Sequence, residues 1–210
     1  YSGSGIETTF TQGEDNCLKS LAAELPDHPA GQRSLLVVGT LADVVEDQFA
    51  RLFEQLGIGP VEFLPPRRAR ELPAIGPDTL LLPAQPFLGE TVRAMIRRGA
   101  TLLQAPYPFG IQGTRDWLLA AAEAWGVDSG RVDEVTAAPR ARAERALAHY
   151  RERLAGQRIT FMPDSQLEVP LARFLNRECG MQLVEVGTPY LDRQVLAGEL
   201  EQLPADVRLS

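Results

Sequence analysis

Short apolar runs alternate with amphipathic helical patterns from residue 34 onward, and this alternation constrains the fold more than any other feature. The segments 43–57 and 90–99 have apolar residues at the spacing of a helix that buries one face. Apolar strands separated by such helices indicate a parallel sheet that is covered on both faces. Four runs have the length and composition of strands: SLLVV (34–38), VEFL (61–64), TLLL (79–82) and TLLQ (101–104).

A second, shorter series follows two further helical segments, at about 115–125 and 138–154, and a break at Gly156. It consists of RITFM (158–162), a helix within 165–179, and QLVEV (182–186). We therefore predict an α/β fold with two Rossmann-like parallel-sheet domains. The second is expected to be incomplete, because one strand–helix–strand unit cannot cover a sheet alone. The predicted division is a polar loop and helix finishing an upstream domain (1–33), a Rossmann-like domain (34–155) and the start of a further one (156–210).

Charge and hydropathy exclude several classes of protein. A formal net charge of −7 argues against a nucleic-acid-binding surface, which needs an excess of Lys and Arg. No uninterrupted apolar run approaches the roughly 20 residues of a membrane helix, so we expect no membrane span and a cytoplasmic protein. The chain begins at Tyr1 rather than Met, and we expect it to be a segment of a longer polypeptide.

Potential metal ligands are few and scattered. Cys17 and Cys179 are far apart in sequence and show no CxxC spacing. His28 lies in a Pro-rich connection and His149 in a charged helix, neither with a second ligand at metal spacing. We predict that this chain coordinates no metal through these residues.

The opening stretch carries an unusual density of polar residues. SGSG (2–5) is not a dinucleotide fingerprint, because Thr8 stands where the third glycine belongs. In TTFTQGED (8–15), Thr11 or Asp15 is a candidate N-cap for the helix that contains Cys17. Loops at the carboxyl ends of parallel strands are also where such folds bind ligands, so a role in a site remains an alternative.

Aromatic side chains follow two of the predicted strands. Phe87 lies in PAQPFLG (83–89), and Tyr107 and Phe109 lie in PYPFG (106–110). Aromatics in these positions could line the cavity of a flat apolar ligand, or they could pack between domains.

The stretch YSGSGIETTFTQGED (1–15) closely resembles the N subunits of light-independent (dark-operative) protochlorophyllide reductases, nitrogenase-like enzymes of chlorophyll and bacteriochlorophyll synthesis. The similarity continues through four later segments. It implies a nitrogenase-like fold and a ferredoxin- and ATP-dependent reduction of the D-ring double bond of protochlorophyllide to chlorophyllide. The four segments are RSLLVVGTLADVVEDQF (33–49), PYPFGIQGT (106–114), FMPDSQLEVPLARFL (161–175) and VGTPYLDRQ (186–194).

The resemblance also implies partners and a cofactor. The family forms a heterotetramer of two N and two B subunits, which transiently binds an iron–sulfur L protein dimer that hydrolyses ATP. A [4Fe-4S] cluster lies between N and B, and its cysteine ligands precede the SGSG motif, so no position in this chain inherits them. The implied compartment is the cytoplasm, or the plastid stroma in a eukaryote.

In the more distant nitrogenase α subunit, the loop equivalent to FTQGED approaches the metal cofactor. By this resemblance Gln12 and Glu14 point toward the active cavity. The candidate substrate-cavity residues are therefore Thr11, Gln12, Glu14, Phe87, Tyr107 and Phe109, with Asp15 as a helix cap.

Two other functions remain open at this stage. One is a subunit of the related chlorin (chlorophyllide) reductase. The other is a non-catalytic nitrogenase-like scaffold or small-ligand binding module. A porphyrin-sized apolar cavity that forms only with a partner would favour a reductase subunit, whereas tight binding of a small metabolite by the chain alone would favour a binding module.

Overall fold

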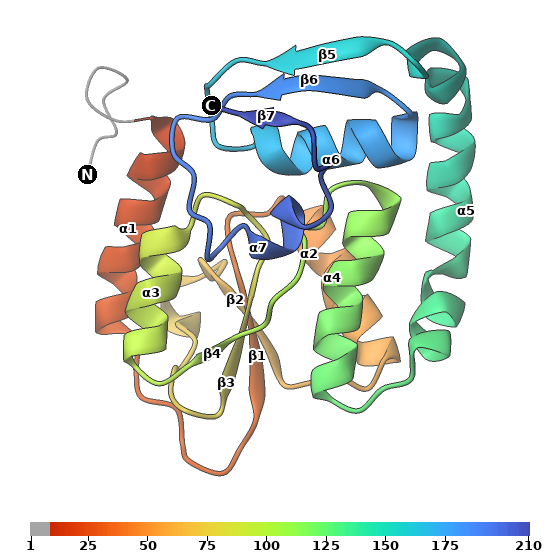
Figure 1. Ribbon diagram of the computed structural model, residues 1–210. Helices are drawn as coiled ribbons and strands as arrows, with labels where there is room; N and C mark the ends of the chain where they lie inside the picture. The colour runs from red at the N-terminus through yellow and green to blue at the C-terminus, as the bar shows by residue number, and fades with distance from the viewer. Residues whose placement is uncertain (1–8) are drawn as a thin grey trace.

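A computed structural model describes residues 9–210 (Figure 1). Its larger sheet contains β1 (Ser34–Val38), β2 (Val61–Leu64), β3 (Thr79–Pro83) and β4 (Thr101–Leu102), in the order β2-β1-β3-β4. All three pairings are parallel. The short 3-10 helix η1 (Ala69–Glu71) lies in the connection between β2 and β3.

Helices cover both faces of this sheet (Figure 1). One face is covered by α1 (Phe10–Glu24) and α3 (Gly89–Arg97). The other is covered by α2 (Asp43–Gln55), α4 (Gly110–Ala124) and the start of α5 (Ser129–Leu154). The result is a three-layer arrangement, as expected for a parallel sheet.

The alternation of side chains along β1 explains the two layers. Leu35 and Val37 belong to the core beneath α2 and α4, whereas Leu36 and Val38 belong to the core beneath α1 and α3. Because successive residues of a strand point to opposite faces, a fully apolar strand must be covered on both sides. Trp117 of α4 fills the centre of the first core, and its indole N–H donates to the carbonyl oxygen of Pro83 at 2.8 Å.

The smaller sheet contains β5 (Arg158–Phe161), β6 (Gln182–Val186) and β7 (Arg208–Leu209), all parallel and in that order. The helix α6 (Glu168–Cys179) covers its inner face, and α7 (Ala197–Leu200) lies in the connection between β6 and β7 (Figure 1). On the outer side, Met162 and Val184 are exposed, and no helix from residues 9–210 covers that face.

The smaller sheet and α6 lie beyond the carboxyl edge of the larger sheet, and α5 runs along the side of both (Figure 1). Glycines allow close approach at this junction. A Cβ atom on Gly113 of α4 would lie 2.2 Å from Nη2 of Arg173 on α6, and one on Gly198 would lie 2.8 Å from the carbonyl carbon of Ala105. Both helices therefore reach their neighbours only because these positions carry no side chain.

The predicted parallel strands are confirmed, but several boundaries differ. The predicted 101–104 strand ends at Leu102, although the amide of Leu103 still donates to the carbonyl oxygen of Leu81 at 2.9 Å. The helix predicted from about 115 begins at Gly110, and the helix predicted from about 138 begins at Ser129, where Asp128 accepts a hydrogen bond from the amide of Gly130.

The division at 1–33, 34–155 and 156–210 stays a prediction. One structural fact bears on it. α1 packs against α3 and contributes Leu18 and Ala22 to the core of the larger sheet, and its C-cap residue Leu25 joins the same core. The first helix of the chain therefore shares the hydrophobic core of the segment that follows it.

Candidate functional site

The candidate site lies at the carboxyl edge of the larger sheet, between α1, α3 and the connection from β6 to α7 (Figure 1). In open parallel sheets, ligands bind outside the carboxyl ends of the strands. Here the end of β3 leads through residues 84–88 into α3, and α1 begins beside this loop.

A capping box starts α1. The hydroxyl oxygen of Thr9 accepts a hydrogen bond from the amide of Gln12 (3.2 Å), and Oε1 of Gln12 accepts one from the amide of Thr9 (2.9 Å). The prediction that Thr11 or Asp15 caps this helix is therefore wrong. Thr9 and Gln12 have the spacing of a reciprocal cap, so the helix starts at Phe10 and includes both predicted capping residues.

Asp15 caps a different helix. Its carboxylate accepts hydrogen bonds from the amides of Glu90 (2.9 Å) and Thr91 (2.8 Å), and from the hydroxyl of Thr91 (2.6 Å). These are first-turn groups of α3, whose own N-cap residue, Leu88, supplies no side-chain acceptor. The positive end of the α3 dipole, a common anion site in such folds, therefore already faces a carboxylate.

A polar pocket of about 300 Å³ lies beside this cap. Its walls come from the first turns of α1, from residues 86–93, and from Gln166, Tyr190 and Asp192. The segments that form it are far apart in sequence, since its lining residues fall within 12–16, 86–93 and 166–192.

Ion pairs run along one wall of the pocket. Glu90 pairs with Lys19 (2.8 Å) and Arg93 (2.6 Å), and Arg93 also pairs with Asp192. Hydrogen bonds from Lys19 and then from Arg93 lower the pKa of Glu90 to about 2. Asp192 also accepts hydrogen bonds from two backbone amides, at residues 194 and 195. The carboxylates of this wall are thus paired within the protein.

The structure brings only some of the candidate cavity residues together. Gln12 and Phe87 line the polar pocket, although Phe87 is only 7% exposed. Thr11 is buried behind the pocket, where its hydroxyl donates to Oε1 of Gln166 at 3.1 Å. Glu14 lies outside the pocket lining, and its carboxylate accepts a hydrogen bond from the amide of Thr40 at 3.3 Å.

Tyr107 and Phe109 lie in a separate core, beneath α6. Tyr107 is 2% exposed, and its hydroxyl donates to the carbonyl oxygen of Val195 at 3.1 Å. Burial raises the pKa of this phenol well above its ordinary value, and the nearby carboxylate of Glu199 adds to the shift. These two aromatics pack at the junction between the sheets and do not line the polar pocket.

A buried charge cluster holds that junction. Arg173 and Glu199, both fully buried, form an ion pair at 2.6 Å. Burial raises the pKa of Glu199, while hydrogen bonding to Arg173 opposes the shift. Glu178, also on α6, accepts hydrogen bonds from the amides of Ile111 (2.7 Å) and Gln112 (3.1 Å), so it caps α4 as Asp15 caps α3.

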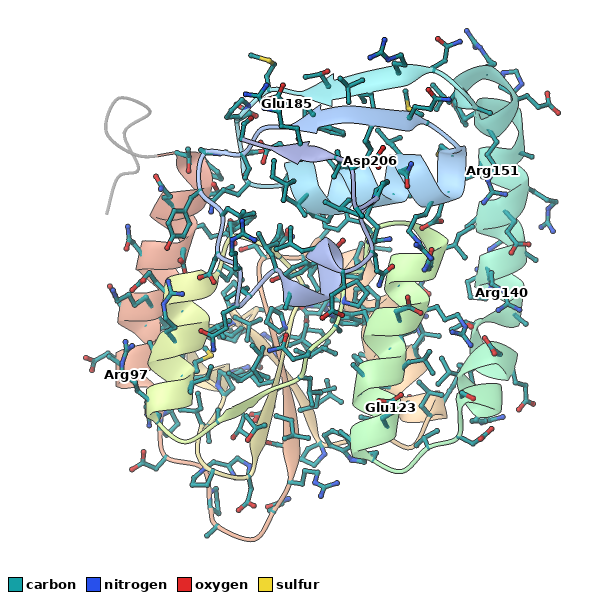
Figure 2. All side chains as sticks on the ribbon, viewed as in Figure 1. Arg97, Glu123, Arg140, Arg151, Glu185 and Asp206 are labelled. Atoms are coloured by element: carbon teal, nitrogen blue, oxygen red, sulfur yellow. The ribbon has the colours of Figure 1, made fainter. Side chains whose placement is uncertain are left out.

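A second cavity, of about 450 Å³, lies between α4, α5 and α6 and is almost entirely apolar. Arg140 and Arg151 project from α5 on this side of the molecule (Figure 2). Arg140 lines the cavity, whereas Arg151 donates to the carbonyl oxygen of Glu178 at 2.5 Å. None of the candidate cavity residues borders this space.

The residues that the structure describes do not fit an iron–sulfur cluster. Cys17 is exposed on α1, and Cys179 is buried at the end of α6. Within residues 9–210, no three His, Cys, Asp or Glu side chains converge as metal ligands. In the same range, none of the helices combines the length and hydrophobicity that crossing a membrane requires.

Sequence comparison decides the family. The model of the nitrogenase component 1 type oxidoreductases matches residues 1–207. The chain belongs to this family. The nitrogenase-like fold inferred from the sequence is thereby confirmed.

Two relatives that this chain resembles are named light-independent protochlorophyllide reductase subunit N. The chain is 64% identical over 210 residues to the protein of that name from Rhodopseudomonas palustris (strain BisB18). It is 62% identical over 209 residues to the one from Halorhodospira halophila. Each comparison covers 100% of this chain and 49% of the relative, so the chain spans about half the length of the curated relatives it matches.

Among solved structures, a chain described as nitrogenase Cp1 at pH 6.5 superposes with a TM-score of 0.65. The match covers 95% of this chain and 49% of that chain at 17% sequence identity. A likeness at this level of identity supports the fold alone.

Three residues that form the pocket were not among the candidates taken from the sequence: Arg93, Gln166 and Asp192. Arg93 lies in an ordinary amphipathic helix, and Asp192 in an irregular segment. Gln166 and Asp192 do fall within two of the segments that resemble the reductase family, which was the only available signal.

Proposed function

We propose that this chain is part of the N subunit of a light-independent protochlorophyllide reductase, and that the complete subunit takes part in reducing the D-ring double bond of protochlorophyllide to chlorophyllide. The observation that carries the proposal is the identity of 62–64% over the whole chain with proteins of that name. The polar pocket at the carboxyl edge supports it, because this is where folds of this kind place a ligand.

In this proposal, the chain binds and orients the substrate and does not carry the electrons. Residues 9–210 offer no converging metal ligands, so a [4Fe-4S] cluster would be held by other parts of the N subunit and by the B subunit. That cluster would supply electrons, delivered to it by an ATP-hydrolysing L protein. The residues described here would position the substrate and exclude water from one side of it.

Two residues of the polar pocket are suited to that task. Phe87 contributes an aromatic side chain to the lining, and Gln12 contributes a carboxamide that is oriented by the capping box. At about 300 Å³ the pocket is at the small end of ligand cavities. It would therefore hold one edge of a tetrapyrrole, while a partner subunit encloses the rest.

The test is reconstitution in the dark. The full-length subunit containing this sequence is purified with its B partner and incubated without oxygen with the L protein, ATP, a reductant and protochlorophyllide. Absorption spectra should show chlorophyllide appearing only when ATP and both components are present. Parallel incubation with chlorophyllide tests the related chlorin reductase. An assembled complex that reduces chlorophyllide only, or neither pigment, would contradict the proposal.

A further inference from the structure

Gln166 has an unusual backbone conformation beside the polar pocket. Its φ of 66° makes it the one non-glycine residue with positive φ among residues 9–210. It is also only 6% exposed. Such a conformation is unfavourable for a residue with a Cβ atom, and it persists only where surrounding contacts impose it.

Contacts with α1 fix the orientation of the Gln166 side chain. Its Oε1 accepts a hydrogen bond from the hydroxyl of Thr11 at 3.1 Å, and the hydroxyls of Thr11 and Thr9 lie 2.9 Å apart. With Oε1 occupied in this way, the amide nitrogen is left for another partner. Gln166 lines the pocket, and its nitrogen bonds to no residue in the 9–210 range.

The remaining polar groups of the pocket indicate what that partner would be. Asp15 is occupied by α3, and both Glu90 and Asp192 are paired with Arg93. The side-chain groups left without a partner within residues 9–210 are the carboxamide nitrogens of Gln12 and Gln166, the whole carboxamide of Asn16 and the hydroxyl of Tyr190. Because the NH2 groups of Gln12 and Gln166 can only donate, a ligand beside them must present acceptor oxygens.

We propose that Gln166 is a specificity-determining residue, whose NH2 group donates a hydrogen bond to a carboxylate or carbonyl oxygen of the substrate while Thr11 holds its other end. This inference rests on the proposed function, in which the substrate is protochlorophyllide. With Gln166 included, the site draws residues from both parts of the structure. Gln166 lies between β5 and α6, next to the smaller sheet, whereas Gln12 and Asn16 belong to α1, which covers the larger sheet.

The test measures binding without turnover, in the assembled complex of N and B subunits lacking the L protein. The dissociation constant of protochlorophyllide is obtained by fluorescence for the wild type, Gln166→Glu and Gln166→Gly. Gln166→Glu replaces the donor by an acceptor of the same shape, and Gln166→Gly removes the side chain while favouring the positive φ. Both should weaken binding at least about tenfold, the loss expected for one buried hydrogen bond to an oxygen acceptor.

Gln157 supplies the matched control, because it is exposed in the turn before β5. Gln157→Glu introduces the same charge and should leave the dissociation constant unchanged. A role of Gln166 in packing alone would shift the urea midpoint of its variants and leave the affinity at the wild-type value, and that result would overturn the inference. Wild-type protein that fails to bind protochlorophyllide would instead refute the proposed function, and this inference with it.

The methyl ester of protochlorophyllide distinguishes the two possible acceptors. If the oxygen belongs to the free carboxylate, the ester should bind the wild type more weakly than the acid does, and Gln166→Gly should abolish this preference. If it belongs to a ring carbonyl, acid and ester should bind the wild type alike, and Gln166→Gly should weaken both. Equal affinity of the wild type and Gln166→Gly for both pigments would contradict either form of the proposal.

Discussion

The carboxylate of Asp15 on α1 accepts hydrogen bonds from both the backbone amide of Thr91 on α3 (2.8 Å) and its hydroxyl (2.6 Å). One side chain thus ties together the N-terminal ends of two helices that lie far apart in sequence. Because the polar pocket is bounded by these two helix ends, the same contact fixes part of its wall.

Replacing Asp15 should therefore destabilise the protein. Asp15→Ala leaves first-turn amides of α3 without an acceptor, and we expect a loss of about 1–3 kcal/mol in the free energy of unfolding. Urea denaturation provides the measurement. Asp206, which is exposed near the C-terminus (Figure 2), gives the control, since Asp206→Ala should change stability by less than about 0.5 kcal/mol. Equal stabilities of the two variants would exclude the capping role.

The buried pair of Arg173 and Glu199 should show strong energetic coupling. Arg173→Met leaves Glu199 buried without its counter-ion, and Glu199→Gln leaves Arg173 with only the more distant Glu178, at 3.8 Å. Each variant should therefore destabilise the protein by about 3–5 kcal/mol. The double variant should be less destabilised than the sum of the two. A double-mutant cycle from urea unfolding gives the coupling energy, and strictly additive effects would mean that the pair contributes nothing beyond its separate parts.

The pH dependence of stability should report the pairing of Glu90. Its pKa of about 2 in the folded protein lies below the ordinary value of 4.5, so its stabilising contribution is present above pH 4.5 and is lost as the pH falls toward 2. The side chain is 43% exposed, which limits the contribution to less than about 1 kcal/mol.

The measurement compares urea unfolding of the wild type and Glu90→Gln across this range. The difference between them should narrow from pH 4.5 downward. Glu123, exposed near the end of α4 (Figure 2), gives the control, because Glu123→Gln removes a carboxylate without a bonded partner among residues 9–210. A difference for Glu90→Gln that stays constant from pH 5 to pH 2 would argue against the pairing.

The strands were predictable because their signal is local. The run SLLVV is apolar after its first residue, Ser34, which suits a strand covered on both faces, and the structure confirms it as β1. The capping residues of the opening stretch were harder to assign. Thr9, Thr11 and Asp15 are all acceptable N-cap types, and only the reciprocal bonds with Gln12 select Thr9.

Contacts between distant segments could not be read from the sequence. The residues around Asp15 do not indicate that its carboxylate accepts a hydrogen bond from α3, from an amide 75 residues later in the chain. Similarly, Tyr107 and Phe87 both follow apolar strands. Tyr107 is nevertheless buried in the core beneath α6, whereas Phe87 lines the polar pocket. What separates them is the position of the smaller sheet, which the alternating pattern does not specify.

The central claim is that substrate contacts this chain at the polar pocket, and Gln12→Glu tests it most directly. Glutamate at this position retains the capping box, so the free energy of unfolding should stay within about 0.5 kcal/mol of the wild type. It also replaces the NH2 group of a residue that lines the pocket by a negatively charged oxygen. Glu14→Gln serves as the comparison, because Glu14 lies outside the pocket lining.

The measurement is the KM for protochlorophyllide in dark reduction by the reconstituted full-length complex. We predict that Gln12→Glu raises the KM at least about tenfold, as expected when a donor to an oxygen acceptor becomes a repelling charge. Glu14→Gln should leave it near the wild-type value. A wild-type KM for Gln12→Glu in a stable, assembled complex would contradict the assignment of this pocket to the substrate.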